Sequence, residues 1–300
     1  MVDILVPAGI GDIYWVMIKM QSFIEKRLGG EIPTIYTCEV DPKKSNRSQE
    51  FMERIPFVKY GGGFFTKSAI GTNSWFGTDW LIPDYEHNGR KFDYLFCLNG
   101  VVRNGFDLER ECGLDAFETN WYFPINPAPE EDVAALQYRS ELGNYVVGFF
   151  SGDGMFSRWV AEMNHHAIYD HLTKIHERTG FKIVLTGKDW DWDTGVNQKI
   201  LALDANKGIL VNKLGQTTVN QLFALMKNSK GIFGWHGGNT MMGVVFKVPT
   251  FMIWSKYFKN SKFYENCLPP DKNGWYDFDV ASNWVSGNYV DRFLKLGTHD

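Results

Sequence analysis

The sequence has few cysteines, no long apolar run and no excess of positive charge. Its four cysteines lie far apart without a Cys-x-x-Cys pair, which favours reduced thiols over a disulfide framework. No apolar run approaches the ~20 residues needed to span a bilayer, and the first residues lack the basic stretch of a signal peptide. A net charge of −4 argues against a broad footprint for nucleic acid. We therefore expect a cytoplasmic protein without a membrane span.

Several motifs of common enzyme classes are also missing. The glycines after the first expected strand do not form Gly-x-Gly-x-x-Gly, so the sequence does not predict an NAD site. There is no P-loop and no Gly-x-Ser-x-Gly. The histidines between 165 and 176 do not fall cleanly on one helical face, and the acidic run at 189–193 lacks the glycine and distal glutamate of a calcium loop. We expect no metal and no cofactor.

The chain does contain two successive runs of alternating strand and helix signals. With 300 residues it is long for one core and comfortable for two domains. The first run opens with a strand at 2–6, a helix whose apolar residues recur from Ile13 to Ile24, and a strand at 33–40. Further strands are predicted at 92–98, 145–150, 181–185 and 208–211, and helices at 133–142 and around 168–175. The stretch 61–88 is rich in aromatic and turn residues and is interpreted as an ordered loop that could recognise a substrate.

A proline-rich segment separates the two runs. Pro124 to Asp132 holds three prolines followed by acidic residues, which is typical of an interdomain linker. We therefore predict an α/β protein with two Rossmann-like domains facing a cleft, over residues 1–125 and 126–280. Residues 281–300 are expected to form a last helix that could pack back on the N-terminal domain.

The stretch 230–254 predicts a strand, a tight loop, a helix and a second strand. Gly234, Gly237 and Gly238 allow a sharp turn, and either Asn239 or Thr240 could cap the helix. Because a helix N-terminus presents free N–H groups and a positive dipole end, this loop could bind an anion such as phosphate. A glycine-rich turn without a ligand is the alternative.

Asp12 occupies a comparable position in the first domain. It follows the loop that begins at Ala8, where the first strand ends and the first helix begins. Open α/β sheets place ligands at the carboxyl ends of their strands, which favours a functional aspartate. The alternative is that Asp12 is only the N-cap of the helix.

Three places in the sequence together resemble one family. They are Gly9-Ile-Gly11-Asp12, Ser157-Arg158-Trp159, and the run that passes through Ile183–Gly187 and Leu214–Leu222 and continues from Gly234 to Pro249. This pattern resembles the heptosyltransferase-like glycosyltransferases, whose fold is GT-B and which act without a metal and invert the sugar carbon. The resemblance spans the whole chain in outline and aligns well from about residue 145 to 254.

The resemblance implies roles for individual residues. Asp12 would be the general base, and Arg158 with the N–H groups of Gly237, Gly238 and Asn239 would hold the diphosphate of a nucleotide-sugar donor. The first domain would then be the acceptor side, and the second the donor domain. Further residues expected on the donor side are Ser151, Gly152, Thr186, Gly187, Lys188, His236 and Thr240, while Gly9 and Gly11 belong to the acceptor side.

Two of these residues have an alternative role, and this sequence departs from the family pattern at three positions. His236 could contact the phosphate or the sugar, or be a packed loop histidine, and Lys188 could reach the phosphates or face solvent. His236 and Met241 stand where the family has an acidic residue and a histidine, and Arg158 replaces a lysine with a planar, bidentate group. The donor sugar and nucleotide are therefore left open.

The predicted function is an inverting, metal-independent transfer of a sugar from a nucleotide-diphospho-sugar to a hydroxyl acceptor. A glycan is the expected acceptor, and a hydroxylated nucleobase in DNA is a less favoured one because of the net negative charge. A nucleotide-sugar epimerase of the same fold and a non-catalytic sugar- or nucleotide-binding module are the alternatives.

Overall fold

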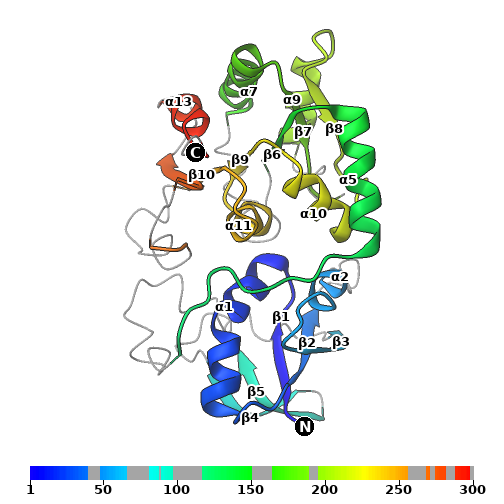
Figure 1. Ribbon diagram of the computed structural model, residues 1–300, viewed down its shortest axis with the longest axis vertical. Coiled ribbons are helices and arrows are strands. Elements are labelled where there is room, and N and C mark those ends of the chain that lie inside the picture. The colour runs from blue at the N-terminus through cyan, green and yellow to red at the C-terminus, as the bar shows by residue number, and fades with distance from the viewer. Residues whose placement is uncertain are drawn as a thin grey trace. The chain divides into compact units, whose positions relative to one another are not determined.

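The computed structural model describes residues 1–39, 48–65, 81–87, 89–96, 117–150, 164–188, 195–255, 268–270, 274–281 and 288–297. The chain divides into two compact units. The N-terminal unit comprises Met1–Pro127 and Asn260–Pro269, and the C-terminal unit comprises Ala128–Lys259 and Pro270–Asp300. Each unit contains one sheet (Figure 1), so the predicted pair of Rossmann-like α/β domains is confirmed as the fold class.

The N-terminal sheet has the order β3-β2-β1-β5-β4. Its first strand, β1, pairs in parallel with both β2 and β5, and only the edge strand β4 runs antiparallel to its neighbour. The strands are β1 (Asp3–Pro7), β2 (Thr34–Glu39), β3 (Lys59–Phe65), β4 (Leu81–His87) and β5 (Arg90–Phe96). A short helix, α2 (Gln49–Met52), precedes β3.

Helix α1 (Ile10–Arg27) packs on one face of this sheet through its apolar residues (Figure 1). Phe23 is 1% exposed and makes edge-on contacts with Tyr94 and Phe96 of β5. The helix is longer than the apolar pattern 13–24 indicates, because it begins directly after Gly9 and ends with Lys26 and Arg27, which suit the negative end of the helix dipole.

The interpretation of 61–88 as one irregular loop was wrong at both of its ends. Residues 61–65 continue strand β3, and 81–87 form β4, which pairs antiparallel with β5. Glycine at 61 has a physical reason, since a Cβ there would lie 2.4 Å from Cε1 of Tyr36. The dipeptide Asn88-Gly89 is a hairpin signal, and Gly89 has a φ of 77°. Residues 66–80 lie outside the described ranges.

The C-terminal sheet is wholly parallel and has the order β11-β10-β9-β6-β7-β8. The first strand in the sequence, β6, is therefore central. The next two strands, β7 and β8, lie on one side of it, and β9, β10 and β11 lie on the other. This is the doubly wound Rossmann order. The strands are β6 (Tyr145–Phe149), β7 (Lys182–Leu185), β8 (Leu210–Asn212), β9 (Ile232–Trp235), β10 (Thr250–Ser255) and β11 (Tyr276–Ala281).

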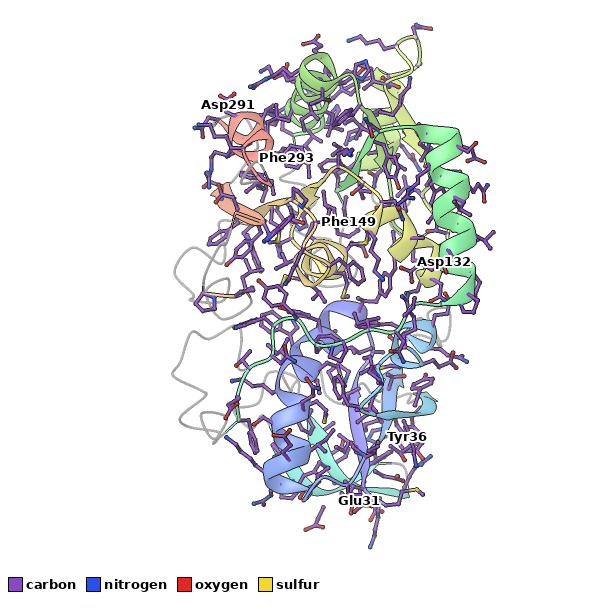
Figure 2. The ribbon with its side chains drawn as sticks, in the orientation of Figure 1. Glu31, Tyr36, Asp132, Phe149, Asp291 and Phe293 are labelled. Carbon is purple, nitrogen blue, oxygen red and sulfur yellow. The ribbon has the colours of Figure 1, made fainter. Side chains whose placement is uncertain are left out.

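Helices cover both faces of this sheet (Figure 1). On one face, α7 (His165–Thr179), α9 (Val196–Leu203) and α13 (Tyr289–Leu294) share a hydrophobic core with the strands. The other helices are α10 (Val219–Lys227), α11 (Gly238–Val245) and α5 (Pro129–Leu142). Figure 2 marks two core rings, Phe149 of β6 and Phe293 of α13, which are 6% and 3% exposed.

The linker predicted over Pro124–Asp132 is only partly a linker. Helix α5 starts at Pro129, and its first turn contains Glu130, Glu131 and Asp132. Proline is favoured at the first helical position, and acidic residues are favoured in the first turn. The proline and the acidic residues that suggested a linker are therefore the start of a helix. The division between the two units falls between Pro127 and Ala128.

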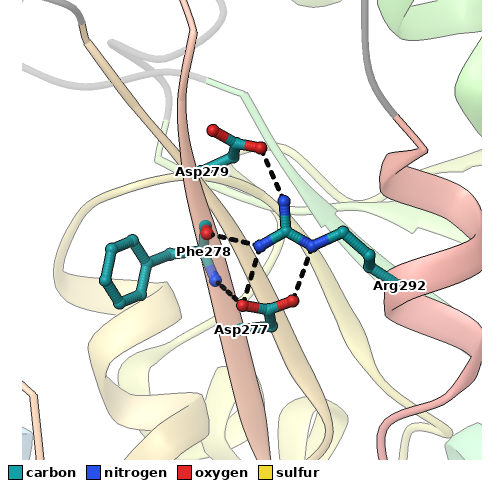
Figure 3. Close-up of polar contacts among 4 residues, drawn as sticks. All are labelled: Asp277, Phe278, Asp279 and Arg292. Carbon is teal, nitrogen blue, oxygen red and sulfur yellow. Dashed lines mark hydrogen bonds and ion pairs between the residues drawn. The ribbon is translucent and has the colours of Figure 1, made fainter.

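The C-terminal helix is shorter than expected and packs within its own unit. Tyr289, Val290 and Phe293 of α13 belong to the core shared with α7 and β10, in contrast to the expectation that this helix packs back on the N-terminal domain. Arg292 also ties α13 to β11. Its guanidinium donates to both carboxylate oxygens of Asp277 at 2.7 and 2.8 Å, to Asp279 at 2.5 Å and to the carbonyl of Phe278 at 2.7 Å (Figure 3).

Candidate functional site

The strand order of the C-terminal sheet locates its candidate ligand site. The winding direction reverses between β6 and β9, which are neighbours, with Phe149 opposite Gly234. In doubly wound sheets, ligands bind at the carboxyl ends of the strands at such a reversal. The segment after β9 leads directly into α11 at this point, so His236 and Gly237, with the first residues of α11, lie at the position where the fold favours binding.

The backbone of this loop is held by hydrogen bonds. The N–H of His236 donates to the carbonyl of Ile253 at 3.1 Å, and the N–H of Gly237 donates to the hydroxyl of Thr240 at 3.0 Å. Gly237 and Gly238 were both expected to offer an N–H group to a diphosphate, but that of Gly237 is already used within the loop. The N–H groups of Gly238 and Asn239 belong to the first turn of α11, which has no intrahelical acceptors for them.

His236 is a packed loop histidine. Its side chain is 5% exposed and stacks on Trp254, with ring centroids 4.3 Å apart and planes 10° apart. Burial lowers the pKa of His236 to about 3, and a hydrogen bond to the backbone of Ile253 opposes the shift. The imidazole is therefore neutral near pH 7, and it brings no positive charge to a phosphate.

The start of α11 is mostly apolar on its inner side. Met241 and Met242 are 3% and 0% exposed, and the side chain of Thr240 is fully buried. Residues 237–239 are partly exposed. The loop therefore presents backbone groups and the side chain of Asn239 to its surroundings, while Met241 adds no polar group at the surface.

Thr186, Gly187 and Lys188 follow β7, the strand on the other side of β6. The Thr186 side chain is 1% exposed, and both its N–H and its hydroxyl donate to the carbonyl of Gly148, at 3.0 and 3.4 Å. Gly187 has a φ of 150°, which favours glycine, and its carbonyl accepts from the N–H of Gly215 at 2.9 Å. Lys188 is half-buried and follows β7 at the same carboxyl edge.

Three residues expected on the donor side, Ser151, Gly152 and Arg158, lie outside the described residues, and so does the acidic run at 189–193. Within the described ranges, no group of three or more histidine, cysteine, aspartate or glutamate side chains could hold a metal ion. No helix among those residues is long and apolar enough to cross a membrane.

Asp12 lies in the first turn of α1, at the carboxyl end of β1. The N-cap of α1 is Gly9, so the alternative that Asp12 is itself the N-cap was wrong. Gly9 has a φ of 134°, which favours glycine, and its N–H donates to the hydroxyl of Ser48 at 3.1 Å. Asp12 is the third residue of α1, directly after Gly11, and is half-buried. The first turn of a helix, near the positive end of its dipole, is a position that favours acidic residues.

The N-terminal sheet has its own reversal, between β1 and β5. Asp12 follows β1, so it lies at the edge where the rule applied to the loop after β9 places a ligand. The sequence indicated both positions. It gave no sign of Ser48 as the partner of Gly9 or of Trp254 as the partner of His236, because both partners are distant along the chain.

Comparison with known proteins supports this fold. No protein-family model matches the chain, and no curated protein matches it. Among solved structures, the ADP-heptose lps heptosyltransferase II of E. coli has a TM-score of 0.62 at 13% identity and covers 98% of this chain and 97% of its own. A glycosyl transferase family 9 protein from Veillonella parvula has a TM-score of 0.60 at 14% identity, covering 93% of this chain and 86% of that one. The UDP-GlcNAc 2-epimerase of Methanocaldococcus jannaschii scores 0.50 at 9% identity, covering 98% and 91%. The chain thus has the two-domain GT-B fold of the heptosyltransferases over nearly its whole length.

Proposed function

We propose that this protein is an inverting, metal-independent glycosyltransferase that moves a sugar from a nucleotide-diphospho-sugar to a hydroxyl acceptor. The observation that carries the proposal is the start of α11, which lies at the winding reversal of a Rossmann-ordered sheet and has no side-chain N-cap. Such a helix start binds the negative charge of a diphosphate. The fold shared with a heptosyltransferase whose name includes ADP-heptose supports the same class of donor.

In this proposal, the two units supply different parts of the reaction. The carboxylate of Asp12 accepts the proton of the acceptor hydroxyl, and the acceptor oxygen attacks the anomeric carbon. The bond from that carbon to the diphosphate oxygen breaks as the new bond forms, and a single displacement inverts the configuration. The proton ends on Asp12, and the negative charge ends on the released nucleoside diphosphate.

The C-terminal unit would stabilise that released charge. The N–H groups of Gly238 and Asn239 are the backbone donors, while Arg158 and Lys188 are the side-chain donors. His236 is neutral and buried, so it shapes the loop without contributing charge. No metal or other cofactor takes part in this scheme. A glycan is the favoured acceptor, and a hydroxylated nucleobase in DNA remains the second one.

A panel of donors tests the proposal directly. The protein is incubated with ADP-, UDP- and GDP-sugars and a set of glycan acceptors, and released nucleoside diphosphate and product are measured by mass spectrometry. We expect equal amounts of nucleoside diphosphate and glycosylated product from at least one pair. Binding of a nucleotide sugar without turnover across the panel would instead identify a sugar- or nucleotide-binding module.

The epimerase is the second candidate, because the UDP-GlcNAc 2-epimerase shares the fold at a TM-score of 0.50. Incubation with the donor alone separates the two. An epimerase converts the nucleotide sugar to its epimer without an acceptor, whereas the proposed transferase leaves its configuration unchanged.

A further inference from the structure

The hydroxyl of Thr240 connects three backbone groups of the loop before α11. It accepts a hydrogen bond from the N–H of Gly237 at 3.0 Å. It also lies 3.3 Å from the carbonyl of Trp235 and 3.0 Å from the carbonyl of Gly237, and it donates its single proton to one of them. Its side chain is fully buried, so this hydroxyl faces the loop and has no access to a ligand outside it.

The loop needs such a hold because two glycines form its turn. Gly237 is fully extended, with φ 166° and ψ −177°, and the next residue is already helical. Glycine reaches many other conformations at little cost, so an unrestrained Gly237-Gly238 pair would sample many directions for the N–H groups that follow. The bond from Gly237 to Thr240 closes a short ring around this turn and selects one of those conformations.

The other side of the loop is supported by packing. A Cβ on Gly237 would lie 3.0 Å from Cε1 of Phe149, so the ring of Phe149 lies directly against this residue. The N–H of His236 is anchored to Ile253 on the neighbouring strand. The loop is therefore fixed at its strand end by β10 and β6, and at its helix end by Thr240.

We propose that Thr240 is a positioning residue, whose hydroxyl presets the N–H groups of Gly238 and Asn239 for a diphosphate without touching the ligand. The proposal rests on the proposed function, since it names how that donor site is organised. It differs from the sequence-based expectation, which placed Thr240 among the residues that bind the donor.

The test compares Thr240→Val, which keeps the shape and removes the hydroxyl, with Thr240→Ser, which keeps the hydroxyl. Thr250→Val is the matched control: Thr250 is also fully buried and donates to a backbone carbonyl, that of Val248 at 2.7 Å, at the opposite end of β10. Thr240→Ala removes the same hydroxyl and replaces the valine variant in both measurements if that variant does not fold.

Two quantities are measured on the full chain. The first is hydrogen exchange of the Gly237 amide in the free protein, followed by NMR. The second is the affinity for ADP, UDP and GDP, measured by calorimetry. We expect the valine variant to exchange the Gly237 amide at least about tenfold faster and to bind the preferred diphosphate about tenfold more weakly, because the N–H of Gly237 loses its acceptor and the loop loses the bond that fixes it. The serine variant and Thr250→Val should stay within about threefold of wild type in both measurements.

The outcomes separate this inference from the proposed function. Unchanged exchange and unchanged affinity in Thr240→Val would overturn the role of Thr240, as would a serine variant impaired as strongly as the valine variant. Faster exchange with unchanged affinity would show that the hydroxyl holds the loop but does not organise the site, which also overturns the inference. If the wild-type protein binds none of the three diphosphates, the proposed function fails, and the role of Thr240 in it fails with it.

Discussion

The imidazole of His236 lies flat on the indole of Trp254, with ring centroids 4.3 Å apart and planes 10° apart. The indole of Trp235 also contacts this imidazole, with ring centroids 5.0 Å apart and ring planes 38° apart. This stack encloses the imidazole in apolar surroundings. The protonated imidazole would be held there away from water, which makes the charged form unfavourable. The pKa of His236 is accordingly lowered to about 3.

This burial predicts that His236 makes folding stability depend on pH. In the unfolded chain, His236 binds a proton below its ordinary pKa of 6.5. In the folded chain, its imidazole stays neutral down to about pH 3. The free energy of unfolding should therefore fall by about 2 kcal/mol between pH 7 and pH 5 from this residue alone. Urea unfolding at the two pH values measures the change.

His236→Phe is the matched variant, since it keeps an aromatic ring against Trp254 and cannot titrate. Other groups contribute equally to both proteins, so the difference between them isolates His236. The pH dependence of the variant should be smaller than that of wild type by about 2 kcal/mol. Equal pH dependence in the two proteins would show that His236 is protonated as easily in the folded chain as in the unfolded one.

A second prediction concerns the ion pairs of α13. Arg292 and Asp277 have side chains that are 27% and 17% exposed, and they bond through two parallel contacts. Arg292→Met removes the cation and leaves the mostly buried carboxylate of Asp277 without its guanidinium partner. The free energy of unfolding should therefore fall by about 2 kcal/mol. This is below the roughly 3–5 kcal/mol of a fully buried pair because some solvent remains. Urea unfolding followed by circular dichroism measures the loss.

The same helix offers a control in the pair between Arg178 and Asp291, whose side chains are 50% and 55% exposed. Figure 2 labels Asp291 on α13. Water screens this pair, so Arg178→Met should cost less than about 1 kcal/mol. Equal losses in Arg178→Met and Arg292→Met would contradict the distinction between the two pairs.

A third prediction compares two glycines of the β9–α11 segment. A Cβ on Gly234 would lie 2.0 Å from the carbonyl oxygen of Phe149, which is backbone of the neighbouring strand. A Cβ on Gly237 would meet only the ring of Phe149, at 3.0 Å, and its extended backbone suits any residue. Gly234→Ala should therefore destabilise by about 3 kcal/mol or more, or prevent folding, and Gly237→Ala by less than about 1.5 kcal/mol.

Thermal unfolding and soluble yield of the two alanine variants measure this difference. The prediction fails if Gly234→Ala is as stable as Gly237→Ala, because β6 and β9 would then be farther apart than their pairing at Phe149 and Gly234 implies.

Short-range patterns in the sequence predicted local structure well. Thr218 and Gln221 stand three residues apart, and the structure contains the capping box that this spacing indicates, with the two reciprocal bonds at 3.0 and 3.2 Å. The strand–loop–helix–strand at 230–254 is also confirmed. In each case the partners are close in sequence, so composition and spacing contain the information.

Features that depend on distant partners, or on the residue at which a helix begins, could not be predicted in the same way. The cap of α11 depends on where the helix begins: because it begins at Gly238, Thr240 reaches back to Gly237 and does not stand at the N-cap. The burial of His236 depends on Trp254, on the next strand. The ring of Tyr36 of β2 fills the space beside Gly61 in the strand at 59–65. None of these contacts leaves a periodic signal.

Asp12→Asn tests the proposed chemistry most directly, with sugar transfer and diphosphate binding measured on the same protein. The amide keeps the size of the side chain in the first turn of α1 but cannot accept the acceptor's proton. We expect transfer from the donor identified in the panel to fall about 10³-fold, with affinity for the nucleoside diphosphate within about twofold of wild type. Transfer at the wild-type rate in Asp12→Asn would contradict the assignment of Asp12 as the general base.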